Sequence, residues 1–108
     1  TNPPAPSGTS SWGDSAQGEP RTDGTGTCGA TCKWINIQTS NLPAGDYTFI
    51  CWTTHGTSNG RYGVWKTASG SIGSSGGRAP CFFGYTGYPV KVEVQGYFGS
   101  FTTKEIWR

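Results

Sequence analysis

Hydrophobic and polar residues alternate along most of this chain with the two-residue period that β-strands require. In Val90–Gln95 every second residue is valine, and lysine, glutamate and glutamine fill the positions between. In Lys33–Thr39 the same spacing places Ile35 and Ile37 on one face. Such alternation is typical of a strand with one face in a core and the other in water. Helical periodicity is found nowhere, so the sequence predicts an all-β protein.

Further strands are predicted where β-branched and aromatic residues lie between turn signals. The Asn-Gly pair within Ser58–Gly60 indicates a hairpin, because both residues tolerate positive φ. The Gly/Ser-rich stretch Ala68–Ala79 is expected to be a flexible loop with one short edge strand around Ile72. About seven strands predict an immunoglobulin-like antiparallel β-sandwich stapled by disulfides. The other strand-like segments are Ser10–Ala16, Asp46–Thr53, Arg61–Thr67, Pro80–Gly84 and Ser100–Trp107.

Alternation also assigns the faces of the two strands beside the predicted hairpin. Before the hairpin, Tyr47 and Phe49 share a face with Cys51 and are expected in the core. After it, Val64 and Trp65 lie on opposite faces. We expect the Trp65 face to point away from the core.

The four cysteines predict two disulfides. Cys51 and Cys81 lie in two apolar, strand-like segments 30 positions apart, as expected when a bridge joins the two layers of a small sandwich. Cys28 and Cys32 are close enough for a local bridge within one turn. Any other pairing would require two neighbouring turn positions to reach two separate strands. We therefore predict the pairs Cys28–Cys32 and Cys51–Cys81.

Other uses of these cysteines and of nearby acidic residues are weaker. Structural zinc sites usually take ligands in close pairs, and only Cys28 and Cys32 form such a pair. Reactive dithiols are usually Cys-X-X-Cys at a helix N-terminus, and nothing helical follows here. Metal binding through Asp14, Glu19 and Asp23 lacks a calcium-loop spacing. No metal or cofactor is expected.

The first residues differ in composition from the rest of the chain. Thr1–Ser11 contains only proline, serine, threonine, glycine, alanine and asparagine, which cannot bury enough surface to fold alone. It is expected to be a flexible linker, followed by one domain over residues 12–108. Trp12 marks the first strand that docks on this domain.

Composition points to an extracellular or cell-surface domain. Only 32% of the residues are hydrophobic, so covalent staples are expected to support the small core. Four cysteines, no methionine and 18 glycines favour an oxidising compartment. The net charge is +2 and the basic residues never form a run, so nucleic-acid binding is not expected. No apolar stretch approaches the roughly 20 residues of a membrane span, and we expect a monomer without direct membrane insertion.

The sequence contains no recognisable catalytic site, so enzyme activity is not expected. The only histidine, His55, lies in a polar turn and is expected to be solvated. No serine is surrounded by the nucleophile-elbow pattern of hydrolases. The six acidic residues fall in loops, the N-terminal region and outer strand faces, which is weak support for a glycosidase pair.

Aromatic residues carry the strongest functional signal. Five tryptophans, five tyrosines and five phenylalanines exceed what so small a core needs, so several must be exposed. Trp34, Trp52 and Trp65 could form one flat platform that stacks on sugars or receives a protein partner. They could equally cover the outer sheet under the Gly/Ser loop or the N-terminal segment. A second set lies in two turns that could meet at one end, as a binding site or as plugs: Tyr85, Tyr88, Tyr97 and Phe98.

Several motifs resemble those of a class of bacterial surface domain. They are Trp12-Gly-Asp-Ser-Ala-Gln-Gly, Cys28-x-x-x-Cys32-Lys-Trp, Pro43-Ala-Gly-Asp-Tyr-Thr-Phe-Ile-Cys51 and Cys81-Phe-Phe-Gly-Tyr. They resemble the cysteine-stapled immunoglobulin- or fibronectin-like C-terminal modules of actinobacterial surface proteins, including ectodomains of membrane-anchored Ser/Thr kinases. The resemblance covers about Trp12–Trp107 and implies an extracellular module behind a proline-rich stalk. It implies no functional residues, because the family has no settled ligand.

The sequence therefore favours a non-catalytic extracellular recognition or sensor module. Such a module would present an aromatic surface to cell-wall glycan or to a surface protein. The alternative is a structural spacer domain on a surface protein. A small secreted hydrolase is a weaker alternative.

Overall fold

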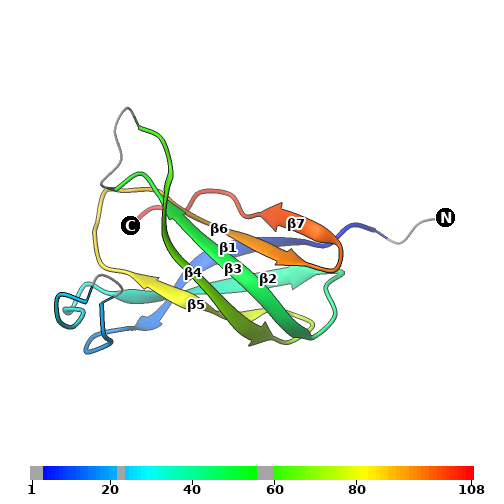
Figure 1. The fold of residues 1–108 in the computed structure, drawn as a ribbon, viewed down its shortest axis with the longest axis horizontal. Coiled ribbons are helices and arrows are strands. Elements are labelled where there is room, and N and C mark those ends of the chain that lie inside the picture. The colour runs from blue at the N-terminus through cyan, green and yellow to red at the C-terminus, as the bar shows by residue number, and fades with distance from the viewer. Residues whose placement is uncertain (1–3, 22–23, 56–59) are drawn as a thin grey trace.

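The computed structural model describes residues 4–21, 24–55 and 60–108. In these residues the chain forms seven strands and no helix, arranged as two antiparallel sheets packed together (Figure 1). The predicted all-β sandwich is confirmed. Nothing in these residues is a helix long and apolar enough to cross a membrane. The strands are β1 (Ser7–Ser15), β2 (Lys33–Ser40), β3 (Gly45–Thr53), β4 (Gly63–Ile72), β5 (Gly77–Phe83), β6 (Val90–Gly96) and β7 (Gly99–Thr102).

The strands are divided between the two sheets differently from those of a constant-type immunoglobulin domain. The smaller sheet has the order β1-β2-β5 and the larger one β4-β3-β6-β7. In constant-type immunoglobulin domains the fourth strand joins the sheet of the first, second and fifth strands. Here β4 pairs along the whole length of β3 instead. The domain is immunoglobulin-like in its two layers, with its fourth strand in the opposite sheet.

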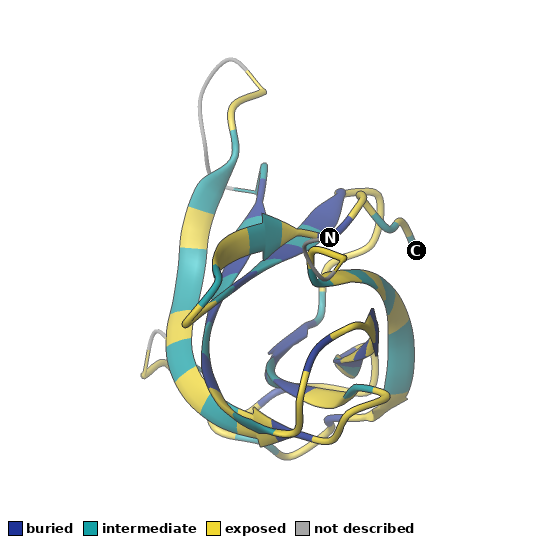
Figure 2. Ribbon diagram, turned by 90° about the vertical axis from the view of Figure 1, so that its right-hand side faces the viewer, coloured by how far each residue is buried: buried dark blue, intermediate teal, exposed yellow. Residues whose placement is uncertain are grey.

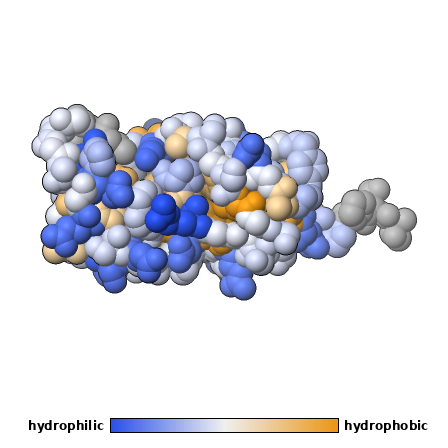
Figure 3. Space-filling model, turned by 90° about the horizontal axis from the view of Figure 1, so that it is seen from below, coloured by the Kyte–Doolittle hydropathy of each residue, from blue (hydrophilic) through white to orange (hydrophobic). Residues whose placement is uncertain are grey.

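The core lies between the sheets and consists of the residues that alternation predicts. Ile35 and Ile37 of β2 and Tyr47 and Phe49 of β3 are buried, and so are the three valines of β6. Figure 2 shows buried or half-buried positions alternating with exposed ones along the strands. Seen from below, the surface is mainly hydrophilic with a limited apolar area (Figure 3). The predicted inward faces of these strands are confirmed.

Both predicted disulfides are present. Cys51 of β3 and Cys81 of β5, with their Cα atoms 6.7 Å apart, join the two sheets through the core. Cys28 and Cys32, with their Cα atoms 5.9 Å apart, close a loop immediately before β2. This second bridge belongs to a smaller apolar cluster that also contains Ala16, Phe82 and the half-buried Trp34.

The N-terminal strand begins earlier than the composition predicts. β1 starts at Ser7 and its first residues pair with the end of β2, so the predicted linker boundary at Ser11 is wrong. An edge strand can consist of small polar residues, because backbone hydrogen bonds rather than side chains attach it to its neighbour. Ser10 adds a 2.7 Å hydrogen bond from its hydroxyl to that of Thr103.

The predicted Gly/Ser loop is also ordered. β4 continues to Ile72 and β5 begins at Gly77, so the flexible loop over Ala68–Ala79 is wrong. Pairing with β3 orders the first part of this stretch, and burial of Ile72 anchors its end. The turn that follows requires Gly76, whose φ is 98° and where a Cβ would lie 2.0 Å from the carbonyl oxygen of Ile37.

The last strand is shorter than predicted. β7 ends at Thr102, whereas a strand over Ser100–Trp107 was expected. Beyond β7 the chain returns only once, where Ile106 forms an isolated bridge with Val90. The predicted turn at Ser58–Gly60 lies mostly outside the described residues.

Loss of the inter-sheet disulfide is expected to cost more stability than loss of the local one. The two bridges span sequence separations of 30 and 4. Loop-closure entropy predicts that the inter-sheet bridge adds about 3–4 kcal/mol to the free energy of unfolding and the local bridge about 2 kcal/mol. Guanidinium unfolding of the double variants Cys51→Ala/Cys81→Ala and Cys28→Ala/Cys32→Ala measures both losses. Equal losses, or a larger loss for the local bridge, would contradict the view that the inter-sheet bridge is the main staple.

Candidate functional site

The three candidate tryptophans do not form one platform. Trp34 lies on β2 in the three-stranded sheet, whereas Trp52 and Trp65 lie on β3 and β4 in the four-stranded sheet. Alternation specifies the face of each side chain within its strand, but it does not assign the strand to a sheet. The predicted shared platform is therefore wrong. Trp34 and Trp52 are each half-buried on the outer face of their own sheet.

Trp65 faces the core rather than the surface. A bulge interrupts the ladder of β3 with β4, because Cys51 pairs with Lys66 and Trp52 pairs with Val64. Trp65 is the extra residue, and an extra residue breaks the alternation on which face assignments depend. The indole packs against the core and Val64 is 52% exposed, which reverses the predicted faces.

The candidate turn residues lie at two separate ends of the sandwich. Tyr85 and Tyr88 precede β6, whereas Tyr97 and Phe98 follow it, so the length of the strand separates the two pairs. At the far end Phe98 stacks on Phe101, and Tyr97 is 74% exposed. The predicted meeting of the two turns is wrong.

An aromatic cluster around His55 forms at the end of the sandwich that contains the loop between β5 and β6. The imidazole stacks on the Tyr85 ring with 3.8 Å between centroids, and Tyr88 meets it edge to face at 4.8 Å. Phe83 lies 6.1 Å from the imidazole and 5.2 Å from the Trp65 ring. His55 is half-buried in this cluster, whereas a solvated side chain was expected. These residues come from segments far apart in the chain, so no local pattern could reveal their association.

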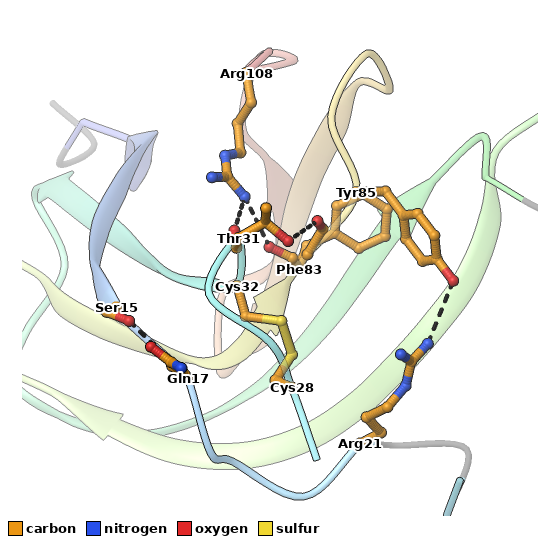
Figure 4. Close-up of a disulfide and its surroundings, with 10 residues drawn as sticks. Ser15, Gln17, Arg21, Cys28, Thr31, Cys32, Phe83, Tyr85 and Arg108 are labelled. Carbon is orange, nitrogen blue, oxygen red and sulfur yellow. Dashed lines mark hydrogen bonds between the residues drawn. A yellow bond between two sulfur atoms is a disulfide. The ribbon is translucent and has the colours of Figure 1, made fainter. Parts of the chain in front are cut away.

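All of these rings except that of Tyr88 line an open cleft of about 630 Å³. The local disulfide forms part of its wall, and Thr31, Thr53 and Arg21 contribute polar groups. Arg21 donates a 3.3 Å hydrogen bond to the Tyr85 hydroxyl (Figure 4). Among the described residues no carboxylate lines the cleft, and no group of three or more metal-ligating side chains occurs. Ring faces beside hydroxyl and guanidinium groups suit a polar ligand that also has an apolar face.

Trp65 contributes a polar atom as well as a ring to this end of the molecule. Its indole nitrogen is buried and has no hydrogen-bond partner among the described residues. Buried N–H groups in proteins nearly always have a partner in the protein or in water. Trp65 also lines the cleft, so this unsatisfied donor lies in a side chain that forms part of the cleft.

Hydrogen bonds hold the local disulfide loop against the end of β5, in the wall of the cleft (Figure 4). The Thr31 hydroxyl donates a 2.7 Å hydrogen bond to the carbonyl oxygen of Gly84. The Arg108 guanidinium donates to the carbonyl oxygens of Thr31 and, at 3.3 Å, of Phe83. A Cβ atom on Gly84 would lie 2.6 Å from the Sγ atom of Cys32. Three separate parts of the chain therefore fix the position of this wall.

Two tyrosine hydroxyls outside the cleft have raised pKa values. Burial is the larger cause at both residues. The neighbouring Tyr97 adds to the rise in the pKa of Tyr47, and the Glu105 carboxylate adds to that of Tyr62. Both hydroxyls stay protonated at neutral pH, because even the ordinary tyrosine pKa is about 10. Tyr47 uses its proton to donate a hydrogen bond to the carbonyl oxygen of Pro43.

Replacement of Gly84 by alanine is expected to lower the free energy of unfolding by about 1–3 kcal/mol, because the new methyl group would collide with the Cys32 sulfur. Gly29 is the matched control, since a Cβ at that position would meet open space. The Gly29→Ala change should stay within about 0.5 kcal/mol of the parent. Chemical denaturation of both variants tests the contact, and equal effects would show that Gly84 and the disulfide are not tightly packed.

The chain matches no protein-family model, no curated protein sequence and no solved structure. The resemblance to actinobacterial surface modules therefore stays a prediction. The function must be inferred from the geometry of the cleft and of the outer surfaces.

Proposed function

We propose that the domain is a non-catalytic extracellular recognition module whose cleft binds a sugar ring of cell-wall glycan. The observation that carries the proposal is the stack of His55 on Tyr85 at the mouth of an open cleft with polar edges. Tyr85 is 42% exposed and Tyr88 is 38% exposed, so their rings are accessible from solvent. A protein loop that carries an aromatic or polar tip is the alternative occupant.

A sugar ring is the ligand class that best matches this combination of groups. One face of a pyranose presents C–H bonds to an aromatic ring, while its edge presents hydroxyl groups that donate and accept hydrogen bonds. The cleft offers aromatic rings from Tyr85 and His55 and hydrogen-bonding groups from Arg21 and Thr31. A volume of about 630 Å³ lies within the usual range for small-ligand sites.

Two further observations support recognition outside the cell rather than hydrolysis. Two disulfides in a domain of this size are compatible with an extracellular location. The described lining of the cleft contains no carboxylate, whereas glycoside hydrolysis usually requires two. Binding of glycan without turnover is therefore the expected behaviour.

A structural spacer is the second candidate, and the shape of the domain favours it. The molecule measures 48 × 31 × 21 Å, and the start of β1 and the C-terminus lie toward opposite ends of its long axis (Figure 1). A domain joined at both ends in this way would hold its neighbours apart. The two functions are compatible, because the cleft opens at one end of the domain and leaves its length unchanged.

Replacement of Tyr85 by alanine is expected to weaken binding of soluble peptidoglycan fragments at least tenfold, which corresponds to about 1.4 kcal/mol. The change removes the ring that stacks on His55 and the hydrogen-bond partner of Arg21. Tyr97→Ala is the matched control, because it removes an exposed tyrosine at the other end of the sandwich. Tryptophan fluorescence measures both affinities, and Trp65 serves as the reporter within the cleft.

Three outcomes of this titration have different meanings. A saturable emission shift that is lost in Tyr85→Ala and kept in Tyr97→Ala supports the cleft as the site. Equal loss in both variants would move the site away from the cleft. No saturable shift with any glycan would reject the sugar proposal and leave the spacer as the better description.

A further inference from the structure

A second surface, which adjoins the cleft at Phe82, combines positive charge with aromatic rings. It lies on the outer face of the three-stranded sheet, where Trp34 of β2 pairs directly opposite Phe82 of β5. We call the four residues Trp34, Phe82, Arg78 and Lys66 the cationic aromatic patch. Its members come from β2, β4 and β5, so the edge strands of both sheets contribute to it.

The rings of the patch hold both cations in place. The Arg78 guanidinium carbon lies 4.1 Å from the centre of the Trp34 ring, and the Lys66 ammonium lies 5.3 Å from that of Phe82. The two rings meet edge to face with 5.1 Å between centroids. A cation over an aromatic face is attracted by the ring quadrupole, which restricts the freedom of the long side chain. Both charges are therefore positioned before any ligand arrives.

The stack leaves the hydrogen-bonding edge of Arg78 available. A guanidinium that lies over a ring still directs its N–H donors outward in its own plane, in the fork that matches carboxylate and phosphate oxygens. Asn36 pairs directly opposite Arg78 on the same outer face and adds an amide donor. The Asn36 side chain lies over Gly13 of β1, where a Cβ atom would come within 2.7 Å of it. Glycine at position 13 makes room for the Asn36 side chain.

No described carboxylate neutralises the two cations. Neither Arg78 nor Lys66 forms an ion pair with an acidic residue among the described parts of the chain. The acidic residue on the same sheet, Asp14, belongs to β1, which is separated from β5 by the whole of β2. Two positioned and uncompensated positive charges favour an anionic ligand.

The surroundings of the patch favour a polysaccharide as the carrier of that anion. Short hydrogen-bonding side chains continue across the outer face of the sheet, where Thr9 pairs with Gln38 and Ser11 pairs with Asn36. All four are exposed and provide hydroxyl and amide groups along a surface without large apolar side chains. Such a surface suits the repeated hydroxyl groups of a sugar chain that runs from the patch across β2 to β1.

We propose that the cationic aromatic patch and this polar face bind an acidic polysaccharide through its carboxylate or phosphate groups. Arg78 receives the oxyanion in its fork, Lys66 adds charge, and Asn36 adds a hydrogen bond. The site shares Phe82 with the lining of the cleft, but its ligand-binding groups, Arg78, Lys66 and Asn36, do not line the cleft. The shared chemistry of the ligand is an oxyanion on a polymer of sugars or sugar alcohols.

Binding of the whole chain to polygalacturonate and to poly(glycerol phosphate) tests the proposal and separates the two oxyanions. Isothermal titration at low salt should show binding to at least one of them and none to dextran, which is neutral. Arg78→Gln should weaken this binding at least tenfold. Arg78→Lys should recover only part of it, because lysine keeps the charge but lacks the planar fork.

Lys104→Gln is the matched control, because it removes one positive charge from an exposed residue beyond β7, outside the patch. It should change the affinity less than twofold, and Tyr85→Ala, which disrupts the cleft, should leave it unchanged. An equal loss of affinity in Arg78→Gln and Lys104→Gln would show that binding depends only on net charge, and it would overturn the site. Failure to bind either polymer, or equally tight binding to polyglutamate, would overturn the assignment of an acidic polysaccharide.

Thermal unfolding separates a binding defect from a folding defect. Arg78 is exposed and its charged group lies outside the core, so Arg78→Gln should melt within a few degrees of the parent. If it does not, Lys66→Gln replaces it as the test of the patch, with the same expected direction. Failure of both variants to weaken binding while the fold is kept would overturn the proposal.

Discussion

The bridge between Cys51 and Cys81 is the constraint on which the rest of the structure depends. It joins β3, one of the two central strands of the larger sheet, to β5 at the edge of the smaller sheet. Few large side chains are fully buried between the sheets, so hydrophobic burial alone gives the domain a small margin of stability. The covalent link removes open conformations of the unfolded chain and keeps the two layers in register.

The second bridge shapes the surface more than it stabilises the core. It folds the Cys28–Cys32 loop against the chain just after β5, where glycine at position 84 allows close approach to the sulfur. Hydrogen bonds from Thr31 to the carbonyl oxygen of Gly84 and from Arg108 to the carbonyl oxygen of Thr31 hold the same contact in place. The aromatic cleft beside this contact has a rigid wall, and rigid walls reduce the entropy that a site loses when a ligand binds.

The cleft and the cationic aromatic patch are the two proposed binding sites of this small domain. The cleft uses ring faces at one end of the sandwich, whereas the patch uses positioned charges on an outer sheet face. Phe82 and Phe83 are consecutive residues of β5, so their side chains point to opposite faces of the strand. Both line the cleft, and Phe82 also belongs to the patch. A polymer that contacts both sites would gain affinity from their linkage without any new contact. The strand that carries Cys81 thus serves the core, the cleft and the patch at once.

The sequence by itself determined the features that depend on local periodicity and on cysteine spacing. The inward faces of β2, β3 and β6 follow from alternation, because successive side chains in a strand point to opposite sides. Both disulfides follow from where the cysteines lie relative to strands and turns.

Only the tertiary structure decided which strands share a sheet, where β1 begins and that β4 continues through a Gly/Ser-rich stretch, because backbone pairing with distant strands sets these features. Pairing of β4 with β3 also placed the bulge at Trp65, which reversed the predicted inward and outward faces of Val64 and Trp65. The stack of His55 on Tyr85 brings together residues 30 positions apart, and the contact of Arg78 with Trp34 spans 44. Contacts of this kind depend on the register between strands, which no local pattern encodes.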